Sequence, residues 1–104
     1  MNLGVQKYPF VSSLLEGKGK IEISNVIPTL ISFNIRPTSI ILTSDINNVD
    51  ALYFGGESIT SAGVNAAGYL NAGDSITLNF DTKNNRLYVI SASGIQYLWA
   101  GAFQ

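Results

Sequence analysis

Short apolar runs alternate with turns rich in Gly, Asn and Ser between Asp50 and Gly101, and this alternation constrains the fold more than any other feature. Within Ser75–Phe80 the apolar side chains occupy every second position, which is the period of a half-buried strand. The polar run 81–85 contains two asparagines, which tolerate the positive φ of a tight reversal. Leu87–Ala92 and Ile95–Ala100 repeat the strand pattern, so we predict three consecutive strands joined as a meander.

The same alternation predicts four more strands earlier in the chain. Proline cannot donate to a strand ladder, so the prolines at 28 and 37 are expected to end the strands beside them. The expected strands are Lys20–Val26, Leu30–Ile35, Ser39–Thr43 and Ala51–Phe54. Ser61–Gly73 is rich in Ala, Gly and Asn and is expected to be a loop, which Tyr69 and Leu70 anchor to the body of the domain.

Together these elements predict an all-β fold. Seven or eight short strands, with turns about every ten residues and no sustained helical period, favour a sandwich or a barrel over folds built from parallel units. We predict a single antiparallel β-sandwich, jelly-roll-like or a small barrel, over residues 20–104. A chain of 104 residues can bury enough core to fold without disulfides or metal ions.

The N-terminal residues 1–19 are predicted to form an extended arm. Their apolar side chains follow no sustained period, and Pro9 blocks a helix while it favours an extended conformation at Tyr8. Tyr8, Phe10 and Leu14 then have two candidate partners, the arm's own sandwich or a neighbouring subunit.

Charge and hydropathy restrict the partners. Charged residues make up 12% of the chain and hydrophobic residues 46%, whereas a typical soluble domain has about 25% charged residues. Low charge is typical of a subunit in an assembly, and equally of a small neutral β-protein. A net charge of −1 argues against a nucleic-acid partner. The longest apolar run, Val26–Ile35, is too short to span a membrane, and Met1–Phe10 does not have the pattern of a secretory signal, so we expect synthesis in the cytoplasm.

The residue types that usually carry chemistry are missing or isolated. The sequence contains no Cys and no His, which removes the commonest thiol, imidazole and zinc chemistry. Asp45–Asp50 offers oxygen ligands for Ca²⁺ but departs from the EF-hand pattern, and a polar turn explains it as well. Glu57 and Asp74 could form a glycosidase pair, although a turn cap accounts for Asp74. We predict no catalytic residue, no cofactor, no metal and no enzymatic activity.

Aromatic side chains gather near the C-terminus. Three interpretations fit them: packing in the core, contact with another subunit, or stacking on sugar rings. The cluster consists of Tyr88, Tyr97, Trp99 and Phe103. We take Tyr97, Trp99 and Phe103, with Tyr8, Phe10 and Leu14 of the arm, as the candidate interface.

Several short motifs carry a resemblance to a known class of proteins. They are Tyr53-Phe54-Gly55-Gly56, Ser58-Ile59-Thr60-Ser61, Tyr69-Leu70, Ala72-Gly73-Asp74-Ser75-Ile76 and Leu87-Tyr88-Val89-Ile90-Ser91, followed by Ser93-Gly94. From Thr38 onward the chain resembles a small module of tailed-bacteriophage structural proteins. The resemblance implies a β-sandwich component of the virion, such as a head-decoration protein, the base of a head fibre or a tail-associated piece.

Two functions from different classes follow from these observations. The first is a structural virion protein that decorates or cements the capsid as a symmetric oligomer and contacts the major capsid protein or another virion protein. A trimer is favoured because capsid lattices offer threefold sites. The alternative is a carbohydrate-binding or adhesion module of a phage fibre or tail, with a glycan as its partner.

Overall fold

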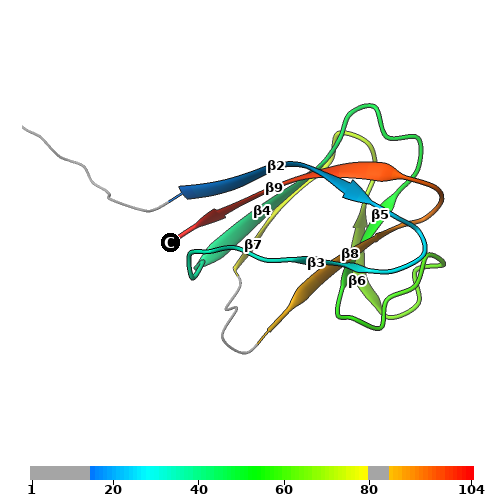
Figure 1. The fold of residues 1–104 in the computed structure, drawn as a ribbon. Helices are drawn as coiled ribbons and strands as arrows, with labels where there is room; N and C mark the ends of the chain where they lie inside the picture. Colours follow the sequence, from blue (N-terminus) through cyan, green and yellow to red (C-terminus); the bar gives the residue numbers. More distant parts are fainter. Residues whose placement is uncertain (1–14, 80–84) are drawn as a thin grey trace, which may run out of the picture.

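Two four-stranded antiparallel sheets face each other in the computed structural model, which describes residues 15–79 and 85–104 (Figure 1). The first sheet has the order β2-β9-β4-β7 and the second has the order β3-β8-β5-β6. The first contains β2 (Leu15–Ile23), β9 (Gln96–Phe103), β4 (Ser39–Ser44) and β7 (Ser75–Asn79). The second contains β3 (Thr29–Ile31), β8 (Leu87–Ser91), β5 (Leu52–Gly55) and β6 (Ala66–Leu70).

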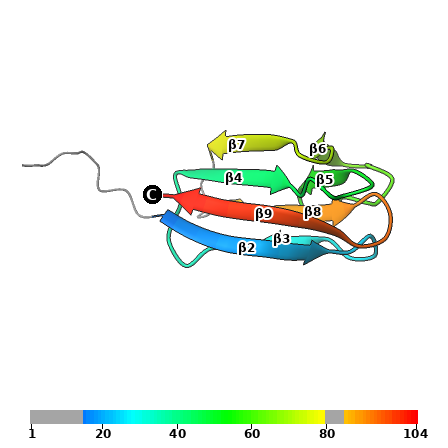
Figure 2. The same cartoon turned by 90° about the horizontal axis from the view of Figure 1, so that it is seen from above.

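The strand order is that of a jelly roll. The pairs are nested: β5 pairs with β6, β4 with β7, β3 with β8 and β2 with β9, so that the first and last of these strands lie side by side. Two further pairs, β4·β9 and β5·β8, complete the sheets. Figure 2 shows the first sheet in front of the second. An eight-stranded double sheet of this kind is a jelly roll, and the predicted all-β sandwich is confirmed.

The predicted meander is wrong. Strands β7, β8 and β9 follow one another in sequence, but β8 lies in the second sheet and pairs with β3 and β5. A turn-rich segment shows that the chain reverses, yet it does not show whether the next strand pairs with the last one or crosses to the opposite sheet. The nested pairing decides this, because each strand on the return path pairs with its counterpart on the outward path.

Several element boundaries also differ from the prediction. The predicted strand Leu30–Ile35 is β3, which ends at Ile31, and the predicted strand Lys20–Val26 ends at Ile23. Strand β2 begins at Leu15, so residues 15–19 of the predicted arm belong to the sheet. The predicted loop Ser61–Gly73 contains strand β6, and Leu70 of that strand is buried while Tyr69 is exposed. Within the described ranges there is no helix that is long and apolar enough to cross a membrane.

The core fills the space between the sheets. Ile23, Ile40, Leu42, Leu52 and Leu98 are completely buried there. They alternate with half-buried neighbours in β4 and β5 and with exposed neighbours in the first half of β9, as the two-residue period of a strand requires. One side of the first sheet therefore packs against the core, and the other side is the outer face of the sandwich.

The β5–β6 loop covers part of the outer face of the second sheet. Ile59 of this loop is buried, and its methyl group lies 2.8 Å from the position that a Cβ would take on Gly55. Gly63, with φ of 84°, lies against the Tyr53 ring. No loop in the described part of the chain covers the outer face of the first sheet in this way, because the large side chains of β9 on that side stay exposed.

Candidate functional site

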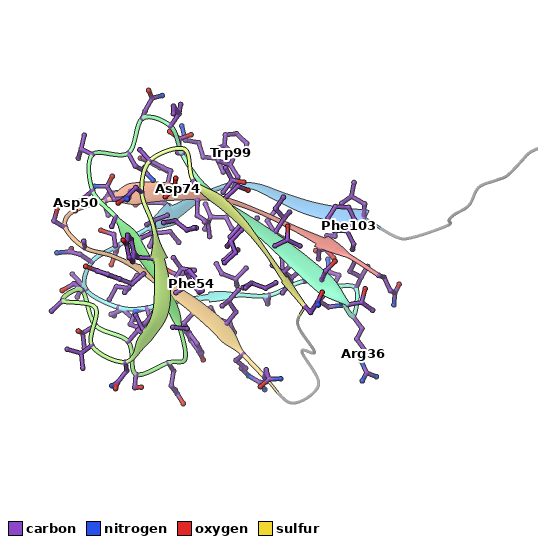
Figure 3. The ribbon with its side chains drawn as sticks, turned by 180° about the vertical axis from the view of Figure 1, so that it is seen from behind. Arg36, Asp50, Phe54, Asp74, Trp99 and Phe103 are labelled. Atoms are coloured by element: carbon purple, nitrogen blue, oxygen red, sulfur yellow. The ribbon has the colours of Figure 1, made fainter. Side chains whose placement is uncertain are left out.

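Three aromatic side chains lie in a row on the outer side of β9. Its residues alternate between the two faces of the sheet, so Tyr97, Trp99 and Phe103 point away from the core with 36%, 44% and 38% of their surface exposed, while Gly101 between them is buried. Figure 3 shows Trp99 and Phe103 on the outer side of the first sheet and Phe54 between the layers. Ile41 of β4 and Leu15 of β2 lie next to the row, opposite Gly101 and Phe103. We call these five residues the aromatic face.

A carboxylate fixes the position of the Trp99 ring. The indole Nε1–H donates to Oδ1 of Asp45 over 2.8 Å, and Oδ2 of the same carboxylate accepts the backbone N–H of Asn47. These bonds, first that of Trp99 and then that of Asn47, hold the pKa of Asp45 below its ordinary value, and the charge of Lys20 adds to the effect. Trp99 is therefore held in one orientation although nearly half of it is exposed.

Tyr97 is fixed through its backbone and its ring. The side-chain amide of Asn48 donates to the Tyr97 carbonyl and accepts from the Tyr97 N–H, both over 2.8 Å. The ammonium group of Lys20 lies 4.8 Å from the centre of the Tyr97 ring, within the range of a cation–π contact. The aromatic face thus has one basic side chain on its β2 side.

Two paired glycines leave a gap between the side chains in the middle of the aromatic face. Gly17 of β2 pairs with Gly101 of β9, between Trp99 on one side and Phe103 with Leu15 on the other. A Cβ on Gly17 would meet nothing within 4 Å, and one on Gly101 would lie 3.4 Å from a methyl group of Ile41. We call this gap the glycine notch.

Exposed aliphatic side chains gather at one end of the sandwich, on the β2–β3, β4–β5 and β8–β9 loops. Their exposed fractions lie between 45% and 89%. The residues are Val26, Ile27, Ile46, Val49 and Ile95, which we call the aliphatic loop end. These three loops lie at the end of the molecule opposite to the C-terminus (Figures 1 and 2).

Hydrogen bonds tie the β4–β5 and β8–β9 loops to each other. The Val49 N–H donates to the Gln96 side chain over 3.0 Å, and the Ser93 hydroxyl donates to Asp50 over 2.6 Å. The Ser93 bond, followed by that from the Ala51 N–H, lowers the pKa of Asp50. The aliphatic side chains of these two loops, Ile46, Val49 and Ile95, therefore stand on segments that hydrogen bonds hold together.

The structure brings together half of the predicted interface. Tyr97, Trp99 and Phe103 share one surface and do not pack in the core. Tyr88 lies in the second sheet and is half-buried. Tyr8, Phe10 and Leu14 lie outside the described residues.

Residues that the sequence did not single out complete the surfaces. Ile41 could have been found, because it alternates with the buried Ile40 and Leu42 and must point outward. Val49 and Ile46 stand in a polar turn, where an apolar side chain is itself a signal.

Three of the acidic residues, Asp45, Asp50 and Asp74, accept hydrogen bonds within and between the loops. Asp45 and Asp50 accept hydrogen bonds from different segments, which supports the turn interpretation of this stretch. Asp74 accepts the Asn71 N–H, and Glu57 lies in the loop at the other end of β6, so the two carboxylates are not paired across a cleft. Among the described residues no group of three or more acidic side chains is arranged to hold a metal ion.

One pocket of about 260 Å³ lies between β3 and the beginning of β8. Its lining includes Leu30, Phe33 and Arg86. None of the predicted interface residues contributes to it, so it is separate from the aromatic face.

The fold and the exposed face define an antiparallel jelly-roll sandwich with a row of aromatic side chains on one outer face. In comparisons with known proteins, no family model, curated protein or solved structure matches this chain.

Proposed function

We propose that this chain is a structural subunit of a tailed-bacteriophage virion, which decorates or cements the capsid surface as a symmetric oligomer. The observation that carries the proposal is the aromatic face. Three aromatic side chains and Leu15 stay exposed, and Ile41 is half-buried beside them, on a sheet whose other side packs against the core.

The chemistry of this face is that of a protein contact. Interface cores are enriched in aromatic residues and depleted in charged ones. Within the aromatic face no residue is charged, and the nearest cation, Lys20, lies at its border. A second copy of the chain or another virion protein would bury these rings.

The virion assignment has two supports. One is the resemblance that the motifs from Thr38 onward carry to phage structural modules. The other is the jelly-roll strand order, an architecture that viral capsid proteins use repeatedly, although unrelated functions use it too.

The proposal is tested by the mass of the purified protein, measured by light scattering coupled to size exclusion, and by sedimentation with empty phage heads. We expect a stable oligomer, with a trimer favoured, that binds assembled shells better than free coat subunits. Phe103→Lys should reduce both the oligomer mass and shell binding, because it places a charge in the contact. Tyr69→Lys is the matched control, since Tyr69 is also an exposed aromatic residue on an outer sheet face. A monomer that does not bind shells contradicts the proposal.

A second candidate, a carbohydrate-binding module, is favoured by the spacing of Tyr97 and Trp99. Side chains two residues apart on one strand stand about 7 Å apart on the same side. Asp45 holds the Trp99 ring fixed, as stacking on a sugar requires. A glycan array decides this candidate: a hit that Trp99→Ser abolishes and Tyr69→Ser retains would support it, and an array without hits contradicts it.

A further inference from the structure

The aromatic face by itself is small for a stable oligomer. At about 4.8 Å per strand and 3.4 Å per residue, four strands of eight residues give the whole outer side of the first sheet an area of roughly 500 Å², and the aromatic face is only part of it. A standard interface buries about 800 Å² on each partner. If the face is an oligomer contact, a further segment must add to the buried area.

We propose that the N-terminal segment, residues 1–14, of a neighbouring copy lies across the aromatic face and places an aromatic side chain in the glycine notch. This inference rests on the proposed function, because it needs an oligomer. It adds the identity of the partner segment and the residues on both sides of the contact.

The position of Leu15 indicates a neighbour as the recipient. Leu15 pairs with Phe103, and Gly17 with Gly101, so the chain enters β2 from beyond the Phe103 end of the face. To reach its own notch, the segment would have to reverse its direction before Leu15. A neighbouring copy beyond that end can receive the segment without a reversal, and residues 1–14 can extend over as much as about 46 Å.

The segment has the composition that the face requires. Its apolar residues include Leu3, Val5, Tyr8 and Phe10, and its charged side chain is Lys7. Pro9 favours an extended conformation at Tyr8, which puts Tyr8 and Phe10 on the same side about 7 Å apart. One of these rings can enter the notch while the other packs on the ring of Trp99 or Phe103.

The Gly17 side of the notch is open to such a side chain, and the buried Gly101 forms its inner side. Gly17 has an ordinary φ, and a Cβ on it would meet nothing within 4 Å. A larger residue at this position therefore fits the subunit and fills the space that the incoming ring would take.

Tryptophan fluorescence can follow this contact directly, because Trp99 is the single tryptophan of the chain. Two full-length variants remove opposite sides of the contact. Tyr8→Ser/Phe10→Ser alters the segment, and Gly17→Leu fills the notch. The matched control is Gly56→Leu, in the β5–β6 loop, where a Cβ also meets nothing within 4 Å.

We expect both variants to show Trp99 emission at longer wavelength, stronger quenching by acrylamide and a loss of oligomer mass, while Gly56→Leu behaves like the original chain. A one-to-one mixture of the two variants tests the exchange. The intact segment of Gly17→Leu should dock on the open notch of Tyr8→Ser/Phe10→Ser, and the mixture should regain part of the protection of Trp99 and part of the mass.

The alternative outcomes are distinct. An oligomer whose mass and Trp99 quenching are unchanged in both variants overturns the inference and leaves the proposed function standing. Increased quenching in both variants without recovery on mixing means that the segment covers its own sheet, which also overturns it. A monomeric original chain overturns the inference together with the oligomer of the proposed function. Circular dichroism confirms that each variant is folded before these results are interpreted.

Discussion

Asp45 and Trp99 hold each other in place at the edge of the aromatic face. The indole N–H stabilises the charged carboxylate, and the carboxylate fixes the ring. An exposed aromatic side chain in a fixed position loses less conformational freedom on binding than a mobile one. The Asp45 bond would therefore lower the entropic cost of the contact that we propose for Trp99.

We predict that Trp99→Phe raises the pKa of Asp45 toward its ordinary value of 3.8, because the largest stabilising hydrogen bond is lost. A carboxyl carbon NMR titration measures this. Tyr97→Phe keeps an aromatic ring on the same face and the indole bond, so it should leave the Asp45 titration unchanged. An Asp45 pKa that stays the same in Trp99→Phe would contradict the assignment.

Asn48 acts as a short extension of β4, because its side-chain amide pairs with the backbone of Tyr97 as a strand would. We predict that Asn48→Ala lowers the free energy of unfolding by about 1–3 kcal/mol, since the Tyr97 N–H and the Ser44 hydroxyl lose their bonds to the amide. Urea denaturation measures the change. Asn47→Ala, at the exposed neighbouring position, should have a much smaller effect, and equal effects would speak against the role of Asn48.

Among the elements, β6 depends on a glycine. Gly68 pairs with Phe54 of β5, and a Cβ on Gly68 would lie 2.6 Å from the end of the Phe54 ring. Since Phe54 belongs to the core, the ring cannot move without disturbing its neighbours.

We predict that Gly68→Ala destabilises the protein by about 1–3 kcal/mol through overpacking. Gly56→Ala, which places its Cβ in open space in the β5–β6 loop, serves as the control and should be close to neutral. Thermal unfolding followed by circular dichroism checks both. A neutral Gly68→Ala variant would show that the ring has room to shift.

The same element shows where the sequence was insufficient. The strands with clear alternation, β4, β5, β7, β8 and β9, were predicted within a few residues. Strand β6 was not, because Ala66, Ala67 and Gly68 favour strands poorly and form one only through their pairing with β5. Local pattern also could not place β8 in the opposite sheet, since sheet membership depends on residues far apart in the chain.

The candidate site was predicted to a similar extent. The alternation of β9 put Tyr97 and Trp99 on one side, but it could not decide whether that side faced the core or the surface. In the structure Leu98 is buried between the sheets, so its neighbours Tyr97 and Trp99 point outward. The glycine notch could not be predicted, because it requires the register of β2 against β9.

At the scale of the whole molecule, three carboxylates make stability depend on pH. Asp45, Asp50 and Glu16 all have lowered pKa values; for Glu16 the main cause is the hydrogen bond from the Ile35 N–H, and the Asn34 N–H adds a second. Their ordinary values are 3.8 for the two aspartates and 4.5 for Glu16. The folded state therefore binds fewer protons than the unfolded state in the acid range.

We predict that these three carboxylates make their full contribution to the free energy of unfolding above their ordinary pKa values. This contribution is lost as the pH falls through their lowered folded values. Urea denaturation at about pH 6 and about pH 3 measures the difference. The Glu16→Gln/Asp45→Asn/Asp50→Asn variant should show a smaller fall over the same range. An equal fall in the variant would assign the acid sensitivity to other groups.

The nested strand order has a consequence for how the protein is made. Strand β9 lies between β2 and β4, so the first sheet cannot form completely until β9 has left the ribosome. The four strands of each sheet come from both halves of the described chain, and neither half contains a complete sheet. We expect a nascent chain arrested before Gln96 to be digested readily by protease and the released chain to resist digestion; early resistance would show that part of the roll forms during translation. Until release, the strands are open to a chaperone or to pairing with a second nascent chain.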